Sequence, residues 1–150
     1  MDHVTLAGDL FLEGYNCAQA VAVAFCDVTG MEKEMTAKLV SPFGGGMGRM
    51  REVCGAVSGM LFVLGHLYGY DNSDADSEKK ELYQQVQQLA EKFREQNGSI
   101  VCRELLGNPP SDPNPSPRTA EYYAKRPCAR MVMTAARLMD EFIAVHPLEA

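Results

Sequence analysis

Residues 53–70 read VCGAVSGMLFVLGHLYGY, and apolar side chains surround the helix that this stretch predicts. Its length just reaches that of a membrane span. However, it contains four glycines and His66, and Arg49, Arg51 and Glu52 directly precede it. We therefore expect a buried central helix and no membrane insertion.

Helical patterns flank this segment on both sides. Residues 77–96 place Leu82, Val86, Leu89 and Phe93 on one face, which predicts an amphipathic helix on the outside of the fold. Shorter helices are expected at residues 3–13, 16–30, 32–40, 100–106 and 127–145. No pair of alternating strands and no internal repeat is evident. The fold class is therefore all-α, a single-domain multi-helix bundle around a central apolar helix.

The composition is that of an ordinary globular protein. The chain has 150 residues, 46% of them apolar and 23% charged, which suits one helical domain spanning residues 1–150. Its net charge of −6 repels phosphate backbones and anionic lipids, so we expect no nucleic-acid partner. The N-terminus carries acids and no basic region typical of a secretory signal, which favours a cytoplasmic protein.

Two segments break the helical pattern. Residues 41–48, SPFGGGMG, bring together Gly44, Gly45, Gly46 and Gly48. These glycines permit positive φ, and their N–H groups can form an anion-binding nest for a cofactor. The alternative is a tight crossing between two helices. Residues 108–117, NPPSDPNPSP, hold five prolines and predict an irregular loop of the functional or mobile kind.

Four of the five cysteines share a position at the start of a predicted helix: Cys17, Cys54, Cys102 and Cys128. A helix N-terminus favours the thiolate, which is the form that binds metals and attacks disulfides. The alternative is that these cysteines are small buried hydrophobes. Cys26 falls on the opposite helix face from Cys17, so we expect it only to pack. In a reducing cytosol structural disulfides rarely persist, which favours metal ligation or thiol chemistry.

Other side chains carry weaker signals. His3 and His146 lie near the ends of the chain and are expected to be solvated, whereas His66 is expected in the interior. Arg49 and Arg51 lie close to Cys54 in sequence and could favour its thiolate, although a solvated position is the usual one for arginine.

Three motifs together carry a family resemblance: Asn16-Cys17-Ala18-Gln19, the glycine loop at residues 43–49, and CGAVSG at residues 54–59. They resemble the C-GCAxxG-C-C family of putative redox-active proteins, from about Phe11 to Phe142. The resemblance implies a redox site built from the same four cysteines, and Cys26 lies outside its pattern. Some relatives carry a twin-arginine export signal, which this sequence does not show.

Three functions follow from these observations. The leading hypothesis is a four-cysteine redox centre, most simply an iron–sulfur cluster, since four thiolates complete its usual ligand set. Zinc would accept the same sulfurs, although the paired C-x₂₋₄-C spacing of structural zinc sites is missing. The second hypothesis is thiol–disulfide exchange or peroxide reduction by paired cysteines. The third is a helical interaction module without a cofactor. The sequence leaves open whether the protein is an oxidoreductase or an electron carrier; either would need a redox partner protein.

Overall fold

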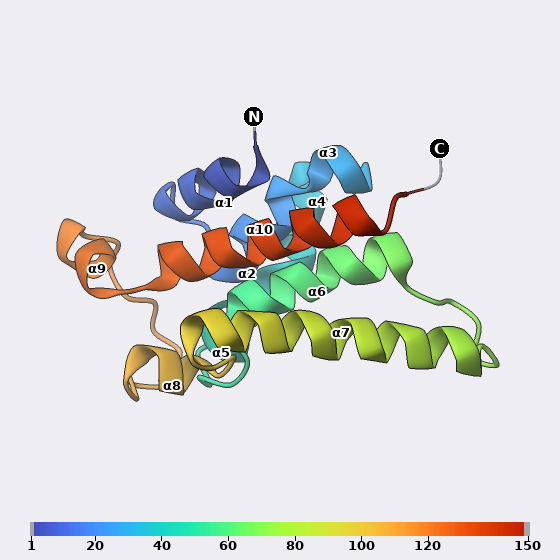
Figure 1. Cartoon of the computed structure of the whole chain (residues 1–150). Coiled ribbons are helices and arrows are strands. Elements are labelled where there is room, and N and C mark those ends of the chain that lie inside the picture. Colours follow the sequence, from blue (N-terminus) through green and yellow to red (C-terminus); the bar gives the residue numbers. More distant parts are fainter. Residues whose placement is uncertain (1, 149–150) are drawn as a thin grey trace.

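Every long element of the chain is a helix (Figure 1). The structure is a computed structural model that describes residues 2–148, so residues 1 and 149–150 of the expected domain lie outside it. Across this range there is no strand, and one isolated antiparallel bridge joins Val53 to Val101. The all-α prediction is confirmed. The longer helices are α1 (His3–Leu12), α2 (Cys17–Ala24), α4 (Lys33–Val40), α6 (Gly55–Tyr68), α7 (Asp76–Asn97) and α10 (Cys128–Val145).

The apolar helix α6 lies at the centre, packed against α2, α10 and α7. Its first turns are buried, whereas Gly65 and His66 near its end are exposed, so His66 is not the interior residue that we expected. The contact with α2 is close because Gly59 lacks a side chain. A Cβ at Gly59 would lie only 2.6 Å from the carbonyl oxygen of Ala18. Small residues thus let the two helix backbones meet.

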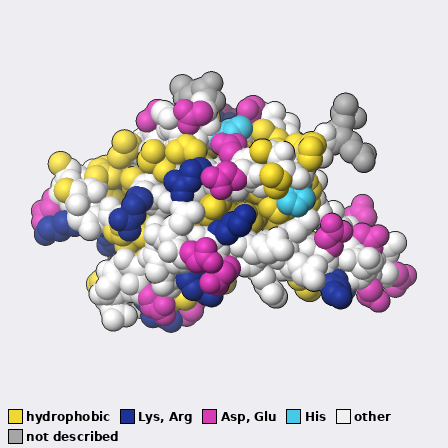
Figure 2. Space-filling model, viewed as in Figure 1, with side chains coloured by type: hydrophobic (Ala, Val, Ile, Leu, Met, Phe, Trp, Pro, Cys, Tyr) yellow, Lys and Arg dark blue, Asp and Glu magenta, His cyan; other side chains and the backbone are white. Residues whose placement is uncertain are grey.

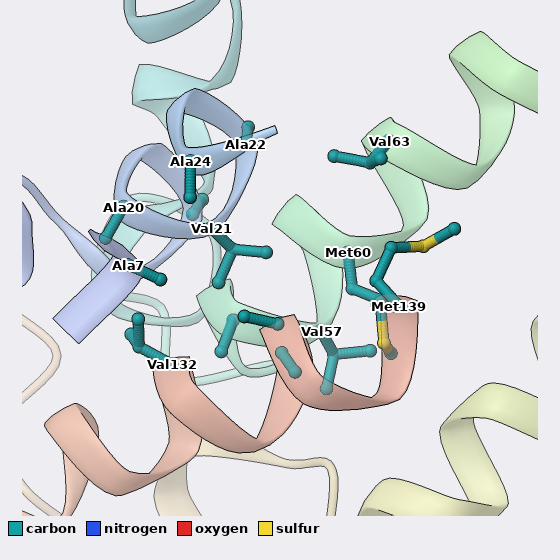
Figure 3. Close-up of a cluster of buried hydrophobic side chains, with 14 of the residues drawn as sticks. Ala7, Ala20, Val21, Ala22, Ala24, Val57, Met60, Val63, Val132 and Met139 are labelled. Carbon is teal, nitrogen blue, oxygen red and sulfur yellow. The ribbon is translucent and has the colours of Figure 1, made fainter. Parts of the chain in front are cut away.

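A single apolar core joins four helices (Figure 3). Ala7 of α1, Val21 of α2, Met60 of α6 and Val132 of α10 are all fully buried in it. Helix α7 covers the outside of this core and buries Leu89 and Phe93 from its apolar face. The predicted amphipathic outer helix is therefore confirmed. Figure 2 shows acidic side chains gathered at the end of the molecule where α7 begins.

The helix expected at residues 16–30 is broken at Phe25. Helix α2 ends at Ala24, and a single turn, α3 (Cys26–Thr29), follows. Phe25 has φ −100° and ψ 14°, and its buried ring stacks on His3 with centroids 4.1 Å apart. The sequence periodicity continues through this point, so the break comes from tertiary packing.

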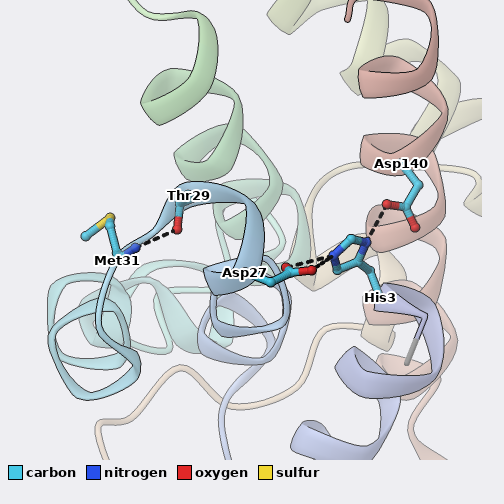
Figure 4. Close-up of polar contacts among 5 residues, drawn as sticks. All are labelled: His3, Asp27, Thr29, Met31 and Asp140. Atoms are coloured by element: carbon cyan, nitrogen blue, oxygen red, sulfur yellow. Dashed lines mark hydrogen bonds and ion pairs between the residues drawn. The ribbon is translucent and has the colours of Figure 1, made fainter. Parts of the chain in front are cut away.

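The imidazole of His3 is partly buried and bridges three helices, contrary to the expected solvated position (Figure 4). Its Nδ1 lies 2.6 Å from a carboxylate oxygen of Asp140, and its Nε2 lies 2.9 Å from one of Asp27. Burial opposes the charged imidazole, but hydrogen bonds to these two carboxylates outweigh it and raise the pKa of His3. The ring of His146, which was also expected to be solvated, stacks on that of Phe142, with the two centroids 3.9 Å apart.

The remaining elements are short. The glycine segment comprises a 3₁₀ turn η1 (Ser41–Phe43) and a short turn α5 (Gly44–Met47). Gly45 and Gly46 have positive φ inside α5, so the backbone is irregular there, as expected. The helix expected at residues 100–106 begins later, as α8 (Cys102–Leu106), because Val101 is held extended by its bridge to Val53. Helix α9 (Ala120–Lys125) was not predicted. Within residues 2–148, no helix combines the length and the apolarity needed to cross a membrane.

Candidate functional site

The bridge between Val53 and Val101 aligns two of the predicted site cysteines. The backbone N–H of Cys54 donates to the carbonyl of Ile100 at 2.7 Å, and that of Cys102 donates to Glu52 at 2.6 Å. Helix α6 begins directly after Cys54, and α8 begins at Cys102. The backbone therefore fixes two cysteines, distant in sequence, at the starts of two helices.

The other two cysteines also begin helices. Cys17 is the first residue of α2, after an Asn16 capping box in which Asn16 and Gln19 satisfy each other's backbone N–H groups. Cys128 is the first residue of α10, and Pro127 is the residue before the helix. The four cysteines thus lie at helix starts, as expected. In Figure 1 these are the starts of α2, α6, α8 and α10.

All four cysteines line one cavity of about 210 Å³. Cys26 is not among the residues that line it, and its Sγ lies 3.4 Å from Oγ1 of Thr36. The structure thus separates Cys26 from the other four, as the sequence predicted. Their chemical roles stay a prediction.

Three of the four candidate glycines, Gly44, Gly45 and Gly46, line the same cavity. Gly46 has φ 72°, and a Cβ there would lie 2.7 Å from both Cys102 Cβ and the backbone nitrogen of Glu52. This position therefore requires glycine for close packing as well as for its backbone angles. Gly48 is not among the cavity-lining residues; it ends α5 in a left-handed conformation.

The thiols of Cys17 and Cys128 form an interacting pair. The neighbouring Cys17 thiol has the largest effect on Cys128 and lowers its pKa to about 7, with further lowering by Arg126, Arg118 and Arg51. The same interaction, together with burial, raises the pKa of Cys17 well above its ordinary value. The pair therefore favours a single thiolate, and the positive charges of the arginines favour its location on Cys128.

The other two thiols behave differently. Burial raises the pKa of Cys54 to about 12, against the opposing effect of the Ala56 and Val57 N–H groups at the start of α6. Burial also raises the pKa of Cys102, although Arg51 partly offsets it. Nη1 of Arg51 lies 3.8 Å from Cys102 Sγ. This guanidinium therefore lowers the pKa of Cys102, and not that of Cys54 as the sequence suggested.

Arg51 is a neighbour of Cys54 in the sequence and a solvated position is the usual one for it, but the structure buries it. It is only 3% exposed, and its Nε donates to the carbonyl of Pro110 at 2.9 Å. Its Nη2 is buried and has no hydrogen-bond partner among the described residues. Because Arg51 lines the cavity, the charge of a buried cation lies at the site.

Two further arginines of the cavity come from the segment around α9, which gave no local signal beyond its closeness to Cys128 in sequence. The guanidinium of Arg118 lies over the rings of Phe11 and Tyr122, at 4.7 and 5.0 Å from their centroids. Its Nη2 donates to the Tyr15 carbonyl at 3.1 Å. The guanidinium of Arg126 also lies over the Tyr122 ring, at 4.9 Å from its centroid. Aromatic packing therefore holds both cations in place.

The proline-rich loop at residues 108–117 is tied to the cavity by arginines. Nε of Arg49 donates to the Asp112 carbonyl at 2.9 Å, and its Nη1 lies 3.1 Å from Ser116 Oγ. Pro115 and Ser116 line the cavity. The predicted irregular loop thus forms part of its wall.

The donor chemistry of the cavity is that of an iron–sulfur or zinc centre. Across residues 2–148, no group of three or more His, Cys, Asp or Glu side chains is placed to hold a single metal ion. The metal role of Cys17, Cys54, Cys102 and Cys128 therefore stays a prediction.

Fold and site together define a helical protein in which four cysteines at helix starts line one cavity. The chain belongs to the C_GCAxxG_C_C family, described as "Putative redox-active protein", whose family model matches residues 15–142. The family resemblance seen in the sequence is thereby confirmed. No curated protein and no solved structure matches the chain.

Proposed function

We propose that this protein is a thiol–disulfide redox protein in which Cys128 is the attacking thiol and Cys17 the resolving thiol. The observation that carries the proposal is the interaction of these two thiols at a cavity lined by arginines. An attacking thiol works best when its pKa is near the ambient pH, and the pKa of Cys128 is lowered to about 7. The family's description as redox-active agrees with this chemistry.

The reaction proceeds in two exchanges. The Cys128 thiolate attacks one sulfur of a substrate disulfide, forming a mixed disulfide and releasing the other sulfur as a thiolate. Cys17 then loses its proton to that released thiolate and attacks Cys128 Sγ, which releases the second substrate thiolate and closes a Cys17–Cys128 disulfide. Two electrons pass from the dithiol to the substrate. The proton of Cys17 ends on the first product thiol, and the second product thiolate takes from solvent the equivalent of the proton that Cys128 had released to it.

A reducing partner must then restore the dithiol. A dithiol protein in the cytoplasm, which we propose as the compartment, would do so by the reverse exchange. The raised pKa values of Cys54 and Cys102 keep both thiols protonated, so neither competes with Cys128 as the attacking group. In this proposal they shape the cavity wall and remain unreacted in each cycle.

A metal or iron–sulfur centre on the same four cysteines is the second candidate. It is favoured by the presence of all four sulfurs at one cavity beside Gly44–Gly46, although the described arrangement brings no three of them to one ion. Such a centre would supply electron transfer when bound. Anaerobic purification with iron, zinc and sulfide analysis separates the candidates. Stoichiometric metal would displace the dithiol proposal, and its absence under anaerobic reconstitution would remove the second candidate.

Single variants test the dithiol proposal. With a small disulfide as substrate, Cys128→Ser should abolish exchange, whereas Cys17→Ser should accumulate a mixed disulfide on Cys128 that intact mass detects. Cys26→Ser is the matched control, because its thiol lies outside the cavity, and it should exchange like the wild type. A Cys128→Ser variant that keeps full exchange activity would overturn the assignment.

A further inference from the structure

Among the described residues, those that line the cavity beside Cys128 include four arginines and no acidic residue. We infer that it is an anion-binding site in which Arg51, Arg118 and Arg126 hold the acidic group of a small disulfide substrate. The anion-binding part stands on the arginines alone. The disulfide part rests on the proposed function, and it names the class of substrate that this dithiol accepts.

The first support is the buried charge of Arg51. Its side chain is 3% exposed and lines the cavity, and its Nε donates to the carbonyl of Pro110. A buried cation without an anionic partner is unfavourable. A carboxylate is the group that best compensates a guanidinium.

The second support is the lack of carboxylate partners. Within the described range, no aspartate or glutamate forms an ion pair with Arg49, Arg51, Arg118 or Arg126. Elsewhere arginines do find such partners: Arg94 pairs with Glu91 at 2.5 Å, and Arg103 with Glu52 at 2.7 Å. The chain as a whole has a net charge of −6, yet arginines without carboxylate partners gather at this one cavity. Such a local excess of positive charge favours binding of an anionic ligand.

The cavity wall offers no fixed negative charge of its own. Among the described residues that line it, four are arginines and none is an aspartate or glutamate. Positive charge therefore remains in excess at the cavity. An anionic group on the substrate would complete the charge balance while its disulfide meets Cys128.

The size of the cavity limits the ligand. Its volume of about 210 Å³ lies below the roughly 300 Å³ at which pockets for drug-sized molecules begin. The fixed positions of Arg118 and Arg126 over Tyr122 also favour a compact acid. Short aliphatic disulfides that end in carboxylates meet both conditions.

Three disulfides of nearly equal size provide the test. Dithiodiglycolate carries two carboxylates, bis(2-hydroxyethyl) disulfide is neutral, and cystamine is dicationic. We expect the wild type to react with dithiodiglycolate at least about tenfold faster than with the neutral compound, and slowest with cystamine, although charge repulsion from the thiolate alone would give the opposite order. Equal rates, or a preference for cystamine, would overturn the inference.

Variants locate the effect. Arg126→Gln and Arg51→Gln should each reduce about tenfold the ratio of the rate with dithiodiglycolate to the rate with the neutral disulfide. A change in the ionisation of Cys128 affects both rates alike and cancels in this ratio. Arg130→Gln is the matched control, because Arg130 is an exposed residue of α10 outside the cavity and its loss changes the net charge equally. A loss of preference in Arg130→Gln as large as in Arg126→Gln would contradict a local site. Since Arg51→Gln also removes a buried contact, Arg126→Gln decides the outcome if the Arg51 variant fails to fold.

Calorimetry on Cys128→Ser separates this inference from the proposed function, because that variant cannot exchange. Binding of dithiodiglycolate that is weakened about tenfold in Cys128→Ser/Arg126→Gln supports the anion site even if no exchange is ever observed. Exchange by the wild type without any charge preference, combined with no calorimetric binding, would leave the dithiol proposal standing and overturn the anion site.

Discussion

The thiols of Cys17 and Cys128 interact across the cavity, although each residue begins a different helix. Helices α2 and α10 pack against each other in the core, so the two starts are held together by the same apolar contacts that stabilise the fold. The interaction favours ionisation of Cys128 and opposes that of Cys17. One packed pair of helices thus differentiates two chemically identical side chains.

Alkylation should report this difference. The rate at which iodoacetamide modifies Cys128 should rise with pH around a midpoint of about 7 and then level off, because the thiolate is the reactive form. Cys17→Ala removes the largest effect that lowers the pKa, so the midpoint should move upward. Rates at each pH can be followed by peptide mass spectrometry.

Arg126 provides a second readout of the same ionisation, because its charge also lowers the pKa of Cys128. Arg126→Gln should raise the alkylation midpoint, whereas Arg130→Gln should leave it unchanged. A wild-type midpoint above 9, near that of an ordinary thiol, would contradict the role of Cys128 as the attacking group.

Gly59 should be the glycine of α6 that the fold tolerates least well when replaced. In Gly59→Ala the new methyl group would lie 2.6 Å from the Ala18 carbonyl oxygen, and separating α6 from α2 should reduce the free energy of unfolding by about 2 kcal/mol. Gly65→Ala is the control on the same helix. Its Cβ would meet nothing within 4 Å, so it should raise stability by up to about 1 kcal/mol. Urea unfolding of both variants measures the contrast, and equal effects would contradict the close contact.

The His3 contacts should make stability depend on pH. Two carboxylates raise the folded-state pKa of His3 above the unfolded value of 6.5. The charged imidazole therefore contributes its full stabilisation below pH 6.5, and this contribution is lost as pH rises through the folded-state pKa. His3→Gln should lower the free energy of unfolding by roughly 0.5–1 kcal/mol more at pH 5.5 than at pH 8.5, since Asp27 is largely exposed. A difference of the opposite sign would contradict the bridge in Figure 4.

The long helices could be predicted because their signal is local. Residues of α7 and α10 repeat apolar side chains with a helical period, and the ends of both helices match the expected ranges closely. Helix α9 could not be predicted from the sequence, because its six residues follow a proline-rich stretch and form no buried apolar stripe. The break at Phe25 could not be predicted either, because it depends on packing against His3, which is distant in the sequence.

The cysteines could be selected from the sequence because their position at helix starts is also local. Their pairing could not, because it depends on which helix starts meet in space. The same holds for the arginines. Arg118 donates to the carbonyl groups of Phe11 and Tyr15, which are more than 100 residues away in the sequence, so no local pattern predicts this contact. The candidate cysteines could therefore be predicted from the sequence, whereas the charged side chains around them could be found only from the fold.

The pairing of Cys17 with Cys128 can be tested most directly by mapping the disulfide that forms in the wild-type protein. The fully reduced protein is treated with one equivalent of diamide under metal-free conditions, the remaining thiols are blocked, and the digest is analysed by mass spectrometry. We predict a Cys17–Cys128 crosslink as the main product, with Cys26, Cys54 and Cys102 recovered as blocked thiols. A main product that links Cys54 to Cys102, or one that contains Cys26, would contradict the proposed dithiol.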